Sequence, residues 1–146
     1  MFKKFKEIIL FLLGFKPKIK EDDNLLERKE IEITALIPAY NEEKDIADTI
    51  ISLKKQTYPV KEIIVIDDCS TDKTHEIAEN LGVKVVKTLQ NTGRKGEALN
   101  FGLQFIKTEY FLIIDADTIV EERAIEALVN QLQKKTISVC GFVLPK

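Results

Sequence analysis

The sequence predicts an open α/β fold in which a mostly parallel sheet is flanked by helices. Short apolar runs rich in β-branched residues alternate with longer stretches whose apolar positions recur at helical spacing. Polar clusters follow several of these runs, at the edge of the sheet where such folds bind ligands. The 146 residues suffice for one domain of ordinary size.

Strands and helices are expected in alternation. The strands cover residues 31–38, 62–67, 83–89, 110–115 and 137–144, and the helices begin near 42, after 72, after 96 and at 121. Pro38 ends the first strand because proline lacks a backbone N–H. Asn41 is expected to cap the first helix, and Gly82 to end the second. This order requires helical crossovers between parallel strands.

Residues 1–30 form a basic, apolar arm and a charged linker, and residues 31–146 form the domain. Residues 1–20 carry six lysines against one glutamate, around an apolar run from Ile8 to Phe15 that is too short to span a bilayer. As a helix, this arm suits either an anionic membrane surface or packing on the domain or a partner. A cytoplasmic location is expected, free or peripheral at the membrane.

Composition narrows the class of protein. A net charge of −2 gives no case for nucleic-acid binding. The two cysteines, Cys69 and Cys140, make neither a disulfide framework nor a metal-ligand set. The only histidine, His75, is expected on an exposed helix without a catalytic role.

The run Phe111–Ile114 ends in two carboxylates, Asp115 and Asp117. On a continuing strand, residues two apart point to the same side. Such a pair suits a hard divalent cation, Mg²⁺ or Mn²⁺, with positions left for water and phosphate oxygens. The alternative is that the pair only ends a strand and begins a turn.

Two other clusters are expected at the same edge, residues 39–42 after the first strand and Asp67 with Asp68 after the second. Asp67 and Asp68 could accept hydrogen bonds from a base or a ribose, or Ser70 or Asp68 could cap the following helix. In the loop 91–97, Arg94 or Lys95 and the backbone amides of a helix start could meet a diphosphate. A solvated turn is the alternative for this loop.

Five segments taken in order resemble family 2 glycosyltransferases over residues 31–144. The segments are Pro38-Ala39-Tyr40-Asn41-Glu42-Glu43, Gln56-Thr57-Tyr58-Pro59, Ile66-Asp67-Asp68-Cys69-Ser70-Thr71-Asp72, Asn91 to Asn100 and Asp115-Ala116-Asp117-Thr118. The Ala98-Leu99-Asn100 segment, together with the Asp-Ala-Asp-Thr sequence, is closest to the polysaccharide-synthase branch.

The resemblance implies the Rossmann-like, nucleotide-binding half of a GT-A fold. It implies transfer of a sugar, with inversion, from a nucleotide donor such as a UDP-sugar to a glycan or lipid-linked acceptor, with Mn²⁺ or Mg²⁺. By matching positions, Ala39, Tyr40 and Glu42 lie beside the nucleoside, Asp67 reads the uracil, Lys95 lies near the donor, Asp115 lies beside sugar and ribose, and Asp117 binds the metal.

Two departures from the family pattern affect the expected function. Cys69 stands where the family's Asp-Gly-Ser has glycine. The acid that activates the acceptor and the Gln-x-x-Arg-Trp motif of synthases are not found, so no catalytic base is assigned. The expectation is therefore a truncated or split enzyme, with a second chain or a homo-oligomer supplying the acceptor half. The alternative is a non-catalytic module that binds a nucleotide-sugar or a partner.

Overall fold

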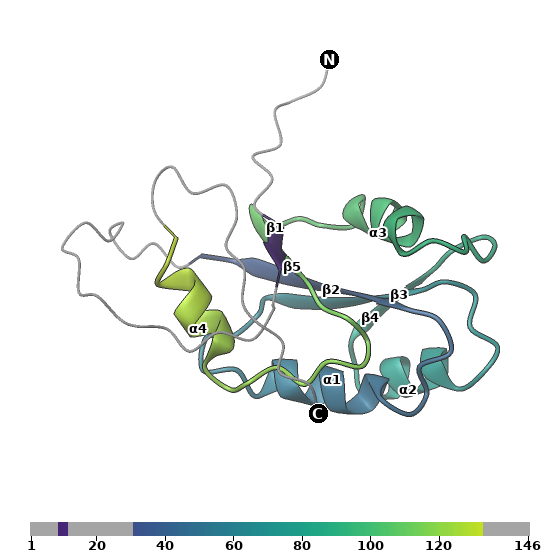
Figure 1. The fold of residues 1–146 in the computed structure, drawn as a ribbon, viewed down its shortest axis with the longest axis horizontal. Helices are drawn as coiled ribbons and strands as arrows, with labels where there is room; N and C mark the ends of the chain where they lie inside the picture. The colour runs from purple at the N-terminus through teal and green to yellow at the C-terminus, as the bar shows by residue number, and fades with distance from the viewer. Residues whose placement is uncertain (1–8, 12–30, 133–146) are drawn as a thin grey trace, which may run out of the picture.

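A five-stranded parallel sheet with helices on both faces forms the protein (Figure 1). This computed structural model describes residues 9–11 and 31–132. The strands, in the order β1-β5-β2-β3-β4, are β1 (Ile9–Phe11), β5 (Tyr110–Ile113), β2 (Ile33–Ala39), β3 (Glu62–Asp67) and β4 (Lys84–Lys87). All neighbouring strands pair in parallel, which confirms the predicted open α/β architecture.

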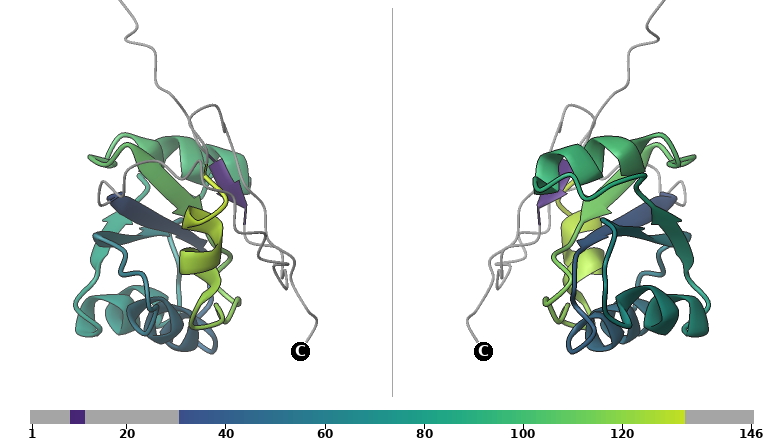
Figure 2. Two further views of the ribbon diagram at one scale, coloured as in Figure 1. Left: turned by 90° about the vertical axis from the view of Figure 1, so that its left-hand side faces the viewer. Right: turned by 90° about the vertical axis from the view of Figure 1, so that its right-hand side faces the viewer.

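The helices lie in two layers, one on each side of the sheet (Figure 2). They are α1 (Ile46–Lys54), α2 (Thr74–Asn80), α3 (Lys95–Leu103) and α4 (Ala124–Val129). Successive residues of a strand face opposite sides, so β3 sends Val65 into the core below α1, α2 and α4, and Ile66 into the core below α3. Gly102 lets α3 approach the sheet, because a Cβ there would lie 2.1 Å from Cδ1 of Ile66.

The first helix starts later in the chain than expected. Asn41 does not cap a helix: it has a φ of 56°, and α1 begins only at Ile46 after a turn. The side chain of Asn41 instead accepts hydrogen bonds from Thr71, since the neighbouring loop offers free N–H groups. Gly82, with a φ of 68°, follows α2 as predicted. The expected strand 137–144 lies outside the described residues.

The amino-terminal arm contributes a strand. The helical expectation is wrong for residues 9–11, which pair in parallel with β5, with Ile9 opposite Phe111. Backbone pairing with an open strand edge satisfies N–H and C=O groups that a short isolated helix would leave to water. The rest of the arm lies outside the described residues, and within the described part no helix is long and apolar enough to cross a membrane.

Candidate donor-binding site

The carboxyl ends of three neighbouring strands meet at one edge of the sheet. The register places Ala39 of β2 opposite Asp67 of β3, and Leu36 of β2 opposite Ile113 of β5. The polar clusters that follow β2, β3 and β5 therefore share this edge, as the sequence predicted. Ala39 itself is buried and accepts a hydrogen bond from the backbone N–H of Asp68, whereas Tyr40 is about half exposed (48%).

The loops after β2 and β3 are joined by side-chain hydrogen bonds. Ser70 Oγ accepts from the N–H of Asn41 at 3.0 Å, and Thr74 Oγ1 accepts from the N–H of Glu42 at 2.7 Å. In return, Asn41 Oδ1 accepts from the N–H of Thr71 at 2.8 Å. These reciprocal bonds fix the backbone beside Tyr40 and Glu42.

Asp67 is completely buried and fully engaged by the protein. Its carboxylate accepts from the N–H of Ser70 at 2.7 Å, and His75 Nδ1 lies 2.9 Å from it. An ionised carboxylate only accepts, so Nδ1 of His75 carries the proton. Burial by itself raises the pKa of Asp67, but the bonds from Ser70 and His75 and the charge of Lys87 outweigh it, and the pKa lies below its usual range.

Asp68 points to the other side, toward the loop that leads into α3. Its carboxylate accepts from Thr88 Oγ1 at 2.8 Å and from the N–H and Oγ1 of Thr92, at 3.0 and 2.8 Å. Asp68 does not cap α2. It orders the loop that carries Lys95 and keeps a small exposed fraction, 7%.

Cys69 links the two aspartates to the following loop and has a left-handed backbone, with a φ of 60°. Its thiol lies 3.2 Å from the carbonyl oxygen of Thr88. This is the position where the resemblance expects glycine, the residue that adopts such a φ without strain.

Asp115 and Asp117 are both exposed beyond the end of β5. Asp115 forms an ion pair with Lys95, the first residue of α3, so two residues predicted from separate motifs are brought together. Asp117 has no hydrogen-bond or ion-pair partner among residues 9–11 and 31–132. The field of these acids reaches Glu42: burial raises the pKa of Glu42, and Asp117, Asp45, Asp72 and Asp115 raise it further. A concentration of negative charge of this kind favours a cation.

The carboxylates of Asp115 and Asp117 fit a divalent cation whose remaining coordination positions are filled by other ligands. Within the described part of the chain, no group of three or more His, Cys, Asp or Glu residues is arranged to hold a metal by itself. Two exposed carboxylates two residues apart would leave most positions of Mg²⁺ or Mn²⁺ to water and phosphate oxygens, the arrangement that Mg²⁺ prefers.

His75 is a residue that sequence reasoning set aside. It is half-buried on α2, and it bridges Asp67 and Glu79, with Nε2 lying 3.3 Å from the Glu79 carboxylate. The signal that could have identified His75 is its place in the first turn of α2, the helix that follows a strand ending in an acid.

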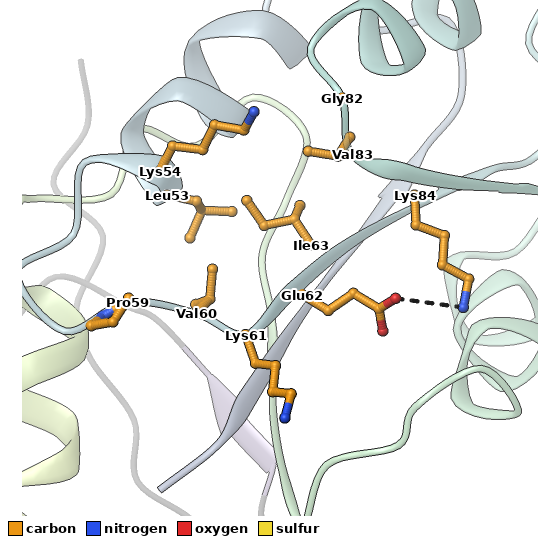
Figure 3. A pocket seen from close by; sticks show the side chains of 10 residues that line it. All are labelled: Leu53, Lys54, Pro59, Val60, Lys61, Glu62, Ile63, Gly82, Val83 and Lys84. Atoms are coloured by element: carbon orange, nitrogen blue, oxygen red, sulfur yellow. Dashed lines mark ion pairs between the residues drawn. The ribbon is translucent and has the colours of Figure 1, made fainter. Parts of the chain in front are cut away.

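A cavity of about 410 Å³ lies at the opposite edge of the sheet, near the amino ends of β3 and β4 (Figure 3). Its lysines already have partners. Lys54 donates to the carbonyl of Leu81, Lys61 pairs with Glu32, and Lys84 lies 3.7 Å from Glu62. None of the predicted site residues lines this cavity.

An open parallel sheet with polar side chains gathered at its carboxyl edge is typical of α/β proteins that bind ligands there, nucleotides among them. Within that class, the family model described as glycosyl transferase family 2 matches residues 34–145. The chain belongs to this family.

Relatives include polysaccharide synthases and enzymes solved with nucleotides. A poly-beta-1,6-N-acetyl-D-glucosamine synthase of Staphylococcus epidermidis is 36% identical over 113 residues, covering 74% of this chain and 27% of that protein. The structure of S. aureus TarS in complex with UDP-GlcNAc aligns with a TM-score of 0.62 at 32% identity, over 66% of this chain and 29% of that one.

A third similar protein was solved with a metal ion. Glucosyl-3-phosphoglycerate synthase from Mycobacterium tuberculosis, in complex with Mn²⁺, UDP and glucosyl-3-phosphoglycerate, aligns with a TM-score of 0.56 at 30% identity, over 73% of this chain and 41% of that one. The chain spans less than half the length of the curated relatives it matches.

Proposed function

We propose that this chain forms the donor-binding part of an inverting glycosyltransferase that uses a nucleotide-diphosphate sugar, expected to be a UDP-sugar, and a divalent cation. The observation that carries the proposal is the meeting of Asp115, Asp117 and Lys95 at one strand edge, with Glu42 in the field of the acids. The UDP and Mn²⁺ in the similar structures support the same donor chemistry.

Base recognition is assigned to Asp68 rather than to Asp67. Asp67 faces α2, is completely buried, and already accepts from Ser70 and His75. Asp68 also accepts from Thr88 and Thr92, but it keeps a small exposed fraction and faces the side of α3, on which Lys95 reaches Asp115. We therefore give Asp67 the role of holding the loop after β3, and Asp68 the contact with the N–H of a base. Tyr40 is exposed at the neighbouring strand end and would pack against that base.

The roles at the diphosphate follow from charge. Asp117 would hold the cation, and Asp115 would share it or accept from the ribose or sugar. Lys95 would turn from Asp115 toward a phosphate oxygen when the donor binds, because an ammonium pairs strongly with phosphate. A cation bound there would neutralise the negative charge that develops on the leaving diphosphate.

Calorimetry of UDP binding, with and without Mn²⁺, tests the proposal on the wild-type chain and on Asp117→Ala. We expect wild type to bind UDP about tenfold or more tightly with Mn²⁺, and the variant to lose that gain. Glu109→Ala is the control, because Glu109 is an exposed acid at the amino end of β5, on the opposite edge of the sheet. UDP binding that needs neither the metal nor Asp117 would refute the donor site.

Turnover is a separate measurement. No acceptor-activating acid is assigned among the described residues, and the acceptor half is expected from further sequence or from a partner chain. Donor hydrolysis or sugar transfer by this chain would establish it as an active enzyme. Metal-dependent UDP binding without turnover would favour the half-site or the non-catalytic binding module.

For the arm, we propose packing on the domain in the cytoplasm rather than residence at a membrane. The parallel pairing of β1 with β5 supports this choice. Flotation with anionic liposomes tests this proposal: the full chain should remain at the bottom of the gradient, apart from the liposomes. Flotation that depends on residues 1–20 would contradict the proposal and favour a membrane-bound arm.

A further inference from the structure

The segment that carries the exposed acids is irregular. Residues 114–123 lie between β5 and α4 and are neither helix nor strand. Their backbone groups therefore lack the partners that a ladder or a helix would supply, and such groups, where buried, must be satisfied by other atoms.

Three side chains on and just beyond α1 supply those partners. Thr49 Oγ1 donates to the carbonyl of Ala116 at 2.7 Å, and Ser52 Oγ accepts from the N–H of Val120 at 3.0 Å. Gln56 uses both ends of its amide. Its Nε2 donates to the carbonyl of Glu121 at 2.7 Å, and its Oε1 accepts from the N–H of Ile125 at 3.1 Å.

The spacing and burial of the three residues make them one structure, which we call the polar stripe of α1. Residues 49, 52 and 56 are three and four apart and so share one side of a helical path. Thr49 is completely buried, and Ser52 and Gln56 are 8% and 7% exposed. They lie beside the apolar residues Ile46, Ile50 and Leu53, which pack on the sheet. Polar groups this deep cost stability unless paired, and here each is paired with the segment after β5.

Thr49 contacts the backbone directly before Asp117. The carbonyl of Ala116 and the N–H of Asp117 belong to one planar peptide unit, so a bond to that carbonyl fixes the plane from which Asp117 departs. Ala116 is buried toward α1, while Asp115 and Asp117 on either side of it are exposed. Because Ala116 is buried and bonded to Thr49, the carboxylates of Asp115 and Asp117 can face solvent in a fixed geometry.

We infer that the polar stripe of α1 is a positioning device for the donor site, with Thr49 setting the orientation of Asp117 and Ser52 and Gln56 holding the segment that follows. The inference rests on the proposed function only in naming the ligand, a cation with a nucleoside diphosphate. None of the three residues is expected to touch that ligand. They act through the backbone of residues 116–125.

The test compares Thr49→Val with Thr49→Ser in the full chain. Valine keeps the branched shape but loses the donor, whereas serine keeps the hydroxyl. UDP binding is followed by calorimetry over a series of Mn²⁺ concentrations. We expect Thr49→Val to raise the half-saturating Mn²⁺ concentration about tenfold, in the range found when residues behind metal ligands are removed. Thr49→Ser should restore most of the affinity.

Thr34→Val is the matched control. Thr34 is also a completely buried threonine, and its hydroxyl pairs with Thr108 at 2.8 Å near the amino end of β2, far from the acids. This variant should lose stability as Thr49→Val does, yet its half-saturating Mn²⁺ concentration should stay within about twofold of wild type, as expected of an uncoupled site. Equal Mn²⁺ dependence in Thr49→Val and wild type, or no recovery in Thr49→Ser, would overturn the inference.

Hydrogen exchange separates this inference from the proposed function. Without any ligand, Thr49→Val should speed exchange in peptides covering residues 116–122 while leaving those of β2 and β3 unchanged. If wild type fails to bind UDP, the proposed donor falls, but the exchange result still decides whether Thr49 holds the segment. Unchanged exchange at 116–122 would refute the stripe itself.

Discussion

Two acidic pairs stand at the same edge of the sheet, and the fold treats them in opposite ways. Asp67 and Asp68, after β3, are buried and accept hydrogen bonds from the surrounding loops. Asp115 and Asp117, after β5, are exposed: the carboxylate of Asp115 pairs with Lys95, that of Asp117 has no partner among residues 9–11 and 31–132, and the backbone between them is held by Thr49. The difference teaches that an acid at a strand end can hold a loop, bind a ligand or, as proposed for Asp68, do both, according to its exposure and the donors that surround it.

The first prediction separates the two pairs by stability. Asp67→Ala should lower the free energy of unfolding by about 2–4 kcal/mol, because it removes a completely buried carboxylate and leaves the half-buried N–H of Ser70 and the ring of His75 without their acceptor. Asp117→Ala should change it by no more than about 0.5 kcal/mol, as for other exposed sites. Urea unfolding of both variants measures this difference, and equal losses of stability would contradict the prediction.

Acid titration sharpens the comparison. The pKa of Asp67 is lowered from 3.8 in the folded state, so its contribution is complete above pH 3.8 and is lost as pH falls through the folded pKa. The stability gap between wild type and Asp67→Asn should therefore be constant near neutral pH and shrink below pH 3.8. A gap that did not shrink as the pH falls below 3.8 would contradict the assignment.

A smaller effect is expected at Cys69. Its φ of 60° is strained for any residue with a Cβ, so Cys69→Gly should stabilise the protein by about 0.5–1 kcal/mol. Cys69→Ala is the control, because it removes the thiol and keeps the strain. If both variants lost the same stability in urea unfolding, the contact of the thiol with Thr88 would outweigh the backbone.

The smallest effect is expected at Glu42, where the exposed pair acts on a neighbour. Its folded pKa is raised above 4.5, so the advantage of the protonated form is present below pH 4.5 and is lost as pH rises through the folded pKa. Glu42→Gln should thus stabilise the protein by a few tenths of a kcal/mol at pH 7 and by nothing at pH 4. Adding Mn²⁺ with UDP should reduce the gain, since a cation near Asp117 neutralises the field.

Much of the fold could be predicted from the sequence because the central strands β2, β3 and β5 are almost entirely buried on both faces. The runs 63–66 and 111–114 are therefore uniformly apolar, and the predicted strands 62–67 and 110–115 agree with β3 and β5 to within two residues. The ion pair of Lys95 with Asp115 was not predicted, although the resemblance assigned both residues to a donor site.

The different roles proposed for Asp67 and Asp68 were not predicted from the sequence. Alternation along β3 sends neighbouring residues to opposite faces, so Asp67 follows Val65 toward α2 and Asp68 follows Ile66 toward α3. Which face of the sheet would bind the donor depends on the position of Lys95, and that position is set by the tertiary structure. The partners of Thr49 and Gln56 lie 67 and 65 residues away, beyond the reach of any local pattern.

The strand β1 has a consequence for the order in which the sheet can form. Its partner β5 comes about a hundred residues later in the chain, and closing so long a loop costs entropy that a three-residue pairing repays poorly. β2, β3 and β5 should assemble first through their larger buried contacts, leaving the outer edge of β5 open meanwhile. The first of the described strands along the chain is then the last to join the sheet.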